Sequence, residues 1–436
     1  MSMVAKSTSR CFIILFLTLF GCNQQSKALK QAVAVKKLNA LLYQKEYFRL
    51  EKELKLCSEN LDDKNKLYYK CFIDNSFNRN EECIRDVNSL LTNSSFKFPD
   101  SVSARLIRLK ADSYFKTFRY AKAAQSDSDL IKHYRYAIHE DAVDDIKNDL
   151  LLRTALKNIP PQQTIIRNTV LIPWTRDKIG LIEIPVRRHG QNYNGIFDTR
   201  ANISSITQSY AGKLGLHILN AVYNEGSGST GINFKTGIGI ADSLQIGNIT
   251  VKNVLFQVMP DTILYLAPIK YQLNMIIGFP VIEQLREVDL FKDGRMVIPV
   301  TPAKSSLHNF ALDHFDPVIA LKSGKDTLLF DFDSGAITSE LYAAYFARYK
   351  NVVLKNGIKR IAEFGGAGGT QKKAIFILPA FHLSLADKPV TIDSMTVLTK
   401  KIYANERFYG NIGQDFIANF SEVVFNFKYM YVRGVK

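Results

Sequence analysis

The chain has 436 residues, of which 46% are hydrophobic and 22% charged, and its formal net charge is +16. This length exceeds what one hydrophobic core supports, so we expect about two or three domains, and the ordinary composition excludes wholesale disorder. The positive charge is spread along the chain without a basic-aromatic motif, which argues against nucleic acid as a partner and favours anionic neighbours such as lipid headgroups.

The N-terminus has the pattern of an export signal. Lys6 and Arg10 precede an apolar run over residues 11–20, which is too short for a permanent membrane span. The run closes on Leu19-Phe20-Gly21-Cys22, and this segment resembles the lipobox of bacterial lipoproteins. A plain secretory signal or an uncleaved anchor is the alternative.

The lipobox resemblance implies a signal peptide over residues 1–21, lipidation of Cys22 and a lipidated tether over residues 22–35. Several acyl chains on one residue would hold the protein stably on a membrane. Asn23 follows Cys22 in place of the Asp associated with inner-membrane retention. We therefore expect a lipid-anchored protein of the bacterial cell envelope, on the outer membrane and facing the periplasm.

Residues 36–158 are predicted to be helical because Gly is scarce and apolar residues recur. Tyr47, Cys83 and Tyr120 anchor three similar segments at nearly equal intervals along the chain, close to the period of helix-pair repeats. The segments weakly resemble the tetratricopeptide family, although its Trp and Pro landmarks are missing. An irregular helical bundle is the alternative, and either form would offer a surface to a protein partner.

The cysteines of the helical segment give no sign of a metal or cofactor. Cys57, Cys71 and Cys83 are an odd set without a Cys-x-x-Cys motif, so they define no disulfide framework, although one bridge is compatible with an oxidising compartment. We expect no metal and no cofactor.

Pro160-Pro161 marks the end of the helical segment, because neither residue continues a helix. Short β-type runs follow. Two predicted hairpins, over residues 182–197 and 317–330, each end just before an aspartate, Asp198 in the first and Asp333 in the second.

The two aspartates begin copies of one motif, Asp198-Thr199-Arg200-Ala201 and Asp333-Ser334-Gly335-Ala336. The same offset in position separates the glycines that end a later Ile-Ile-Gly and Asn-Ile-Gly triplet, Gly278 and Gly413. Glu287-Val288 and Glu422-Val423 keep this offset too. We therefore predict an internal β repeat, with one lobe over residues 165–300 and the other over residues 301–436.

These motifs resemble those of the retropepsin/pepsin-like aspartic proteases, with both lobes in one chain. The resemblance implies an all-β bilobal domain in which Asp198 and Asp333 form a catalytic dyad at a pseudo-twofold axis. It also implies that Gly278 and Gly413 mark strands beside the aspartate loops. The residues expected to support the dyad are Thr199, Ser334 and Gly335, and those expected in flaps over an extended peptide or protein substrate are Gly226, Gly228, Gly365 and Gly366.

Two acids suit amide hydrolysis without a metal. Two carboxylates about 3 Å apart cannot both ionise, so they share a proton and supply one base and one acid. Ala201 and Ala336 stand where many relatives carry a serine hydroxyl, and this loss should raise the pKa values of the dyad. An active enzyme would then work at a higher pH than relatives from acidic compartments.

Arg200 departs from the pattern, because the family has Gly at this position. A long guanidinium there risks crowding the cleft, and its charge favours both carboxylates as anions. Three interpretations stand open: the first lobe is an inactive scaffold, Arg200 points away and activity survives, or Arg200 pairs with an acidic side chain of the substrate. Asp331, two residues before Asp333, is expected to be a satisfied structural acid.

The sequence therefore supports three functions. The first is a membrane-anchored aspartic endopeptidase. The second is a catalytically impaired lipoprotein that binds peptides in the same cleft. The third is an interaction scaffold in which the helical repeats carry the function.

Overall fold

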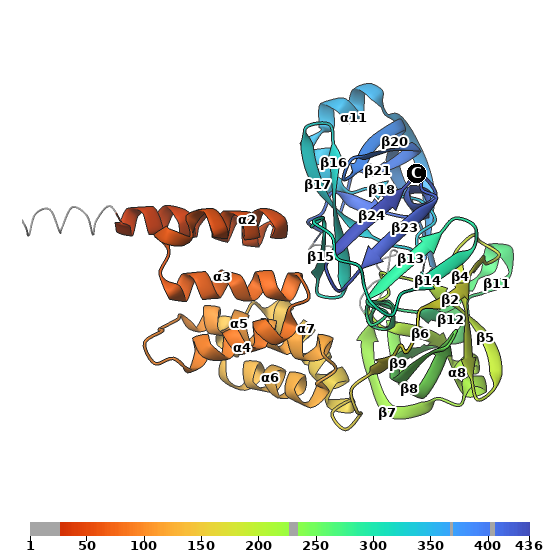
Figure 1. Ribbon diagram of the computed structural model, residues 1–436, viewed down its shortest axis with the longest axis horizontal. Helices are drawn as coiled ribbons and strands as arrows, with labels where there is room; N and C mark the ends of the chain where they lie inside the picture. Colours follow the sequence, from red (N-terminus) through yellow and green to blue (C-terminus); the bar gives the residue numbers. More distant parts are fainter. Residues whose placement is uncertain (1–26, 226–233, 367–368, 402–405) are drawn as a thin grey trace, which may run out of the picture.

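The computed structural model describes residues 27–225, 234–366, 369–401 and 406–436. It has a helical region followed by a β-rich region of two lobes, as the sequence predicts (Figure 1). The signal peptide, Cys22 and the flap candidates Gly226 and Gly228 lie outside the described residues.

The helical region consists of helices joined in pairs. A first helix covers residues 27–43, and the later ones are α2 (Tyr47–Cys57), α3 (Asp63–Ser76), α4 (Asn80–Thr92), α5 (Asp100–Lys116), α6 (Tyr120–His133) and α7 (Glu140–Ala155). Among the described residues, no helix combines the length and the apolar character needed to cross a membrane. Residues 27–35, expected in a tether, are helical instead, because Ala34, Leu38 and Leu41 form a buried stripe at helical spacing.

Three of the turns between these helices have the same geometry. Lys45, Asn78 and Phe118 each adopt a left-handed backbone conformation, with φ of 56°, 58° and 57°. In each turn the next amide donates a hydrogen bond five residues back, the pattern of a Schellman-type helix end. The recurrence of this turn along the chain supports a series of helical hairpins, whereas the relation to the tetratricopeptide family stays a prediction.

The first lobe follows a short connection after α7. Its elements are β1 (Gln163–Ile165), β2 (Val170–Pro173), β3 (Thr175–Arg176), β4 (Ile182–Arg188), β5 (Gln191–Phe197), β6 (Ser204–Thr207), α8 (Gln208–Leu214), β7 (His217–Glu225), β8 (Phe234–Ile246), β9 (Ile249–Met259), β10 (Tyr265–Leu266), β11 (Tyr271–Gln272), β12 (Met275–Ile277), α9 (Phe279–Glu283), β13 (Glu287–Phe291) and β14 (Arg295–Ile298).

The second lobe repeats this order. Its elements are β15 (Phe310–Asp313), β16 (Asp316–Ser323), β17 (Asp326–Phe332), β18 (Glu340–Leu341), α10 (Ala343–Arg348), α11 (Lys350–Asn356), β19 (Ile358–Gly366), β20 (Gly369–Leu385), β21 (Lys388–Leu398), β22 (Gly410–Ile412), α12 (Gln414–Ile417), β23 (Glu422–Asn426) and β24 (Tyr431–Val435).

The register of the strands confirms the repeat. In the first lobe β12 pairs in parallel with β5 and matches Ile277 with Phe197, and in the second β22 pairs in parallel with β17 and matches Ile412 with Phe332. The second pair of residues follows the first at the offset that separates Asp198 from Asp333. The two lobes therefore hold their aspartate loops on equivalent strands.

A five-stranded sheet, in the order β2-β14-β13-β23-β24, joins the lobes. Strands β13 and β23 pair antiparallel at its centre, between the upper and lower lobes in Figure 1. Asp289 there pairs with Val424, which is its own counterpart in the repeat. The pseudo-twofold axis therefore passes through this pair of strands.

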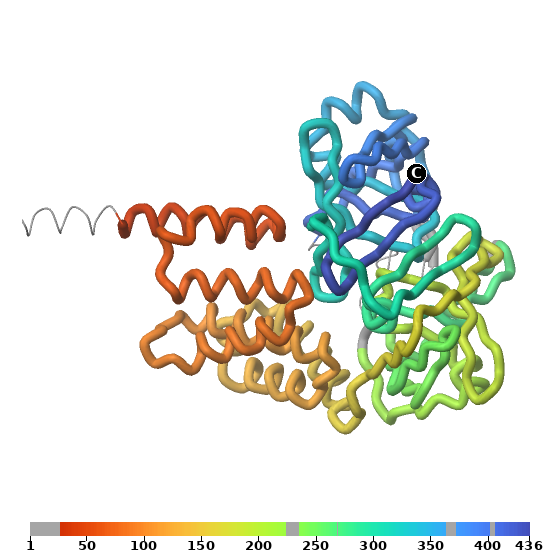
Figure 2. The backbone as a smooth tube through the Cα atoms, in the orientation of Figure 1, coloured from red at the N-terminus to blue at the C-terminus, as the bar shows by residue number. Residues whose placement is uncertain are grey.

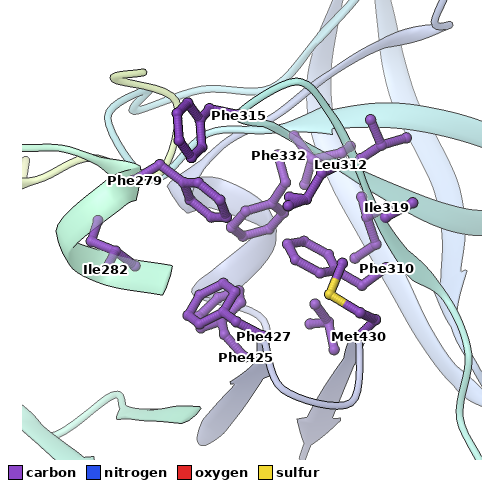
Figure 3. Close-up of a cluster of buried hydrophobic side chains, with 14 of the residues drawn as sticks. Phe279, Ile282, Phe310, Leu312, Phe315, Ile319, Phe332, Phe425, Phe427 and Met430 are labelled. Carbon is purple, nitrogen blue, oxygen red and sulfur yellow. The ribbon is translucent and has the colours of Figure 1, made fainter. Parts of the chain in front are cut away.

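Aromatic side chains from both lobes form one core beside this sheet (Figure 3). The rings of Phe279 and Phe427 are 5.5 Å apart, and those of Phe332 and Phe425 are 5.0 Å apart. Phe315, at the turn between β15 and β16, also lies 5.9 Å from Phe115 of α5. The helical region thus packs on the same core as the lobes.

Charged groups fix the helical region to the same turn, where the two segments lie side by side in Figure 2. Asp313 binds the ammonium of Lys45 and accepts a 2.8 Å hydrogen bond from the Tyr47 hydroxyl. His314 lies 2.8 Å from the carboxylate of Asp112 on α5. These contacts are polar and specific, so they select one docking of the helices on the second lobe.

We expect Asp112→Asn to lower the free energy of unfolding by about 3 kcal/mol, because it leaves the buried ammonium of Lys116, 3.0 Å away, without its counter-charge. Urea unfolding monitored by circular dichroism measures this. Asp144→Asn, which removes an exposed carboxylate on α7, is the matched control and should change stability by less than about 0.5 kcal/mol. Equal effects of the two variants would contradict a stabilising role for the Asp112 contacts.

Candidate active site

Each candidate aspartate stands where a buried strand ends. Asp198 follows β5 and Asp333 follows β17, and their amides donate to the carbonyl oxygens of Ile277 (3.1 Å) and Ile412 (2.9 Å). These acceptors lie on β12 and β22, the strands next to β5 and β17. The sequence therefore delivers both acids to the same place in their lobes.

Hydrogen bonds between Thr199 and Ser334 join the two loops. The Thr199 amide donates to the Ser334 hydroxyl oxygen, and the Ser334 amide donates to the Thr199 hydroxyl oxygen, both at 3.0 Å. Each hydroxyl then donates to a carbonyl of the opposite lobe: Thr199 to Phe332 at 3.1 Å, and Ser334 to Phe197 at 2.7 Å. Both side chains are buried, so each loop completes its hydrogen bonding only with the other.

A second repeated set lies beneath the loops, and the sequence analysis missed it. The hydroxyl oxygen of Ser204 accepts a 3.0 Å hydrogen bond from the amide of Gly278, and that of Ser339 accepts a 2.9 Å hydrogen bond from the amide of Gly413. A Cβ on Gly278 would lie 2.5 Å from the carbonyl oxygen of Ala201, which explains the glycine. The two serines are separated by the same offset as the two aspartates, so the repeat was the signal that could have found them.

The carboxyl of Asp198 lies directly against the second loop. A Cβ built on Gly335 would lie 2.4 Å from its Cγ, so Gly335 allows the close approach. Burial and the nearby charge of Asp333 raise the pKa of Asp198 to about 7, although the amides of Arg200 and Ala201 donate to it at 2.8 Å and 3.1 Å. This direction agrees with the raised dyad pKa expected from the sequence.

Asp333 has different surroundings. Its Oδ1 accepts a 2.8 Å hydrogen bond from the amide of Gly335, and its Oδ2 accepts a 3.2 Å hydrogen bond from Nδ2 of Asn411. Burial raises its pKa, whereas the charge of Arg200 and the Asn411 amide oppose the rise. The two acids are therefore neighbours with unequal environments.

The guanidinium of Arg200 is held by the second lobe. Nη2 lies 2.9 Å from Oδ2 of Asp331, and Nη1 donates to the hydroxyl of Tyr342 at 3.1 Å. That hydroxyl also donates to Asp331 at 3.1 Å. Asp331 is thus a partnered buried acid, as expected, and Arg200 has an internal counter-ion.

The described flap candidates lie on a hairpin. Strands β19 and β20 pair up to Gly365 with Thr370 and Gly366 with Gly369. This places Gly365 and Gly366 at the end of a long β hairpin. The sequence-predicted aspartates, supporting residues and fold-signature glycines are brought together by the structure, whereas these two glycines lie at a hairpin end.

Residues 184–281 match a family model described as aspartyl protease. The match spans the Asp198 loop and Gly278, within the first lobe. No similar protein was found among the curated proteins. The match supports a relation of this chain to the aspartic protease family. Together with the repeated strand register, it establishes an aspartic-protease-like fold for the β-rich region.

We expect Asp198→Asn to raise the melting temperature by several degrees at pH 7.5 and to leave it unchanged near pH 4. The folded state holds its proton up to about pH 7, whereas an unfolded aspartate releases it near pH 4, so the wild type loses stability between these values. The loss is at most about 4 kcal/mol, and thermal unfolding across pH measures it.

Asp393→Asn, which changes an exposed carboxyl on β21, is the matched control for this pH series. Its difference from the wild type should not grow between pH 4 and pH 7.5. A melting temperature of Asp198→Asn that follows the wild type across the whole range would refute the raised pKa of Asp198.

Proposed function

We propose that this protein is a membrane-anchored aspartic endopeptidase. The observation that carries the proposal is the reciprocal hydrogen bonding of Thr199 and Ser334, which sets the loops of Asp198 and Asp333 against each other. Two partly buried acids at such a contact are costly for stability. This loss of stability has a functional reason if the two acids catalyse a reaction.

The proposed reaction uses the shared proton of the dyad. One carboxylate takes a proton from a water molecule as the water oxygen attacks the amide carbon, and the other carboxyl gives its proton to the carbonyl oxygen. The first then protonates the leaving nitrogen as the carbon–nitrogen bond breaks, and the second recovers a proton from the diol. The raised pKa of Asp198 supports this role, because its proton remains available near neutral pH.

The substrate in this proposal is an extended peptide or an unstructured part of a protein. The β19–β20 hairpin, with Gly365 and Gly366 at its end, would cover the bound chain and bind it through backbone hydrogen bonds. The helical region would recruit a protein partner or present the substrate. Its polar docking on the second lobe supports this, because it holds the helices beside the β domain.

One observation favours a second candidate, a peptide-binding lipoprotein that does not cut. Arg200 stands at a position where the family has Gly, and its charge lies near the dyad. The contacts of Arg200 with Asp331 and Tyr342 support the enzyme instead, because they hold the guanidinium on the second lobe.

We expect the purified chain from residue 23 to 436 to cleave an unstructured protein such as casein, and Asp333→Asn to lower the cleavage rate by at least about 100-fold, since the variant lacks one of the two proton-transfer groups. Asp393→Asn is the matched control and should cleave at the wild-type rate. Product formation followed by mass spectrometry measures both. Cleavage that persists in Asp333→Asn would rule out the endopeptidase, and peptide binding without cleavage would favour the second candidate.

The membrane anchor is a separate part of the proposal, and the Leu19-Phe20-Gly21-Cys22 segment supports it. We expect Cys22→Ser to move the protein from the membrane fraction to the soluble fraction and to abolish labelling by a fatty-acid analogue, because the acceptor thiol is gone. Fractionation of the envelope measures both and tests the outer-membrane location. Membrane association that is unchanged in Cys22→Ser would disprove lipid anchoring at this residue.

A further inference from the structure

The two aspartate loops share a framework, but the side chains around them are unequal. In the second lobe, polar groups occupy positions whose counterparts in the first lobe, at the offset of the repeat, are apolar or small. These pairs, with the second-lobe residue first, are Asp331 and Ile196, Asn411 and Ile276, Asp316 and Leu181, and Tyr342 and Thr207. Arg200 itself corresponds to Gly335.

Three of these polar residues, Asp331, Asp316 and Tyr342, form a binding pocket for Arg200. Asp331 is 4% exposed at its side chain and lies 2.9 Å from Nη2 of Arg200, and Asp316 lies 3.9 Å from Nε. Tyr342 is buried and bonds both Arg200 and Asp331. A charge placed by chance in this interior would have no counter-ion and would cost several kcal/mol. Because the second lobe supplies groups that bind the guanidinium, Arg200 is an integral part of the site.

Asn411 is the other asymmetric group. It is 5% exposed and donates to Oδ2 of Asp333, and its Oδ1 is buried without a hydrogen-bond partner among the described residues. An apolar side chain such as the counterpart Ile276 would avoid that orphan oxygen, which costs about 1–3 kcal/mol. The amide is therefore retained at a cost, and its one bond goes to the candidate dyad.

Other charged groups face Asp333 from each neighbouring element. Arg200 and Asp198 face it from the first loop, and Asp331 precedes it on β17. Glu340 of β18 also faces it, and Lys373 of β20 in turn lowers the pKa of Glu340, which burial raises to about 7. Of these groups, Arg200 is the cation that acts most strongly on Asp333, and Asn411 is the neutral side-chain donor to its carboxylate.

We propose that Arg200 and Asn411 are positioning residues that assign the two roles in the dyad. Asp333, beside both of them, stays ionised and takes the proton from water. Asp198, whose carboxyl lies against Gly335, carries the shared proton and gives it to the carbonyl oxygen of the amide. This inference rests on the proposed endopeptidase function and adds which acid performs which step.

The repeat supplies the variants that test this assignment. Asn411→Ile gives the second lobe the residue of the first, and the double variant Arg200→Gly with Asp331→Ile gives each lobe the residue that the other has at these two positions. Both remove a group that stabilises ionised Asp333, so its apparent titration should move up by about one pKa unit, towards that of Asp198. Carboxyl ¹³C NMR of protein labelled at aspartate measures this without any turnover, with signals assigned from Asp198→Asn and Asp333→Asn.

In the wild type, the signal of Asp333 should titrate at lower pH than that of Asp198. Where cleavage is measurable, the acidic limb of kcat/KM should move to higher pH by about one unit in both variants, because this limb follows ionisation of the base. The mirror variant Ile276→Asn adds an amide at the first-lobe position that corresponds to Asn411, and it should lower the pH at which Asp198 titrates.

Two outcomes would overturn the assignment: Asp333 titrating above Asp198 in the wild type, or both signals unmoved in Asn411→Ile. If the double variant does not fold, as judged by its circular dichroism, Asn411→Ile and Ile276→Asn still decide the question. Absence of Asp333-dependent cleavage would refute the endopeptidase, but the order of the two titrations is read independently of it.

Discussion

The structure depends on one exchange of hydrogen bonds, that between Thr199 and Ser334 at the contact of the lobes. Both side chains are buried, and each satisfies a backbone amide of the opposite loop and donates to a carbonyl there. Neither lobe can complete this set by itself, and an unsatisfied buried amide is costly. The exchange therefore fixes the two lobes in one register.

The surroundings of this exchange are organised differently in the two lobes. The first lobe packs apolar residues around its aspartate loop, whereas the second uses buried charges, of which Asp331 is paired with Arg200. The turn from Asp313 to Asp316 carries the same kind of contact outward, since Asp313 binds the helical region and Asp316 lies near Arg200. Electrostatic contacts thus run from the helices to the loop of the candidate dyad.

Much of the fold could be predicted from the sequence, because a repeat imposes one offset on every equivalent residue. That offset identified both aspartates, the hairpins that precede them, and the glycines Gly278 and Gly413. It could not show where the Arg200 side chain points, because that depends on Asp331 and Tyr342, which come close only in the folded chain. The helix over residues 27–35 was missed for a similar reason: a short polar sequence becomes helical when its few apolar residues find a core.

The pocket of Arg200 has a consequence for how such a site can be assembled. A Cβ at Gly335 would collide with the carboxyl of Asp198, so the second loop has no room for a side chain at the position that Arg200 occupies in the first. Two identical subunits would have to carry arginine at both positions or at neither. An asymmetric pair of acids of this kind therefore requires two halves that are free to differ in sequence, as the two halves of a single polypeptide are.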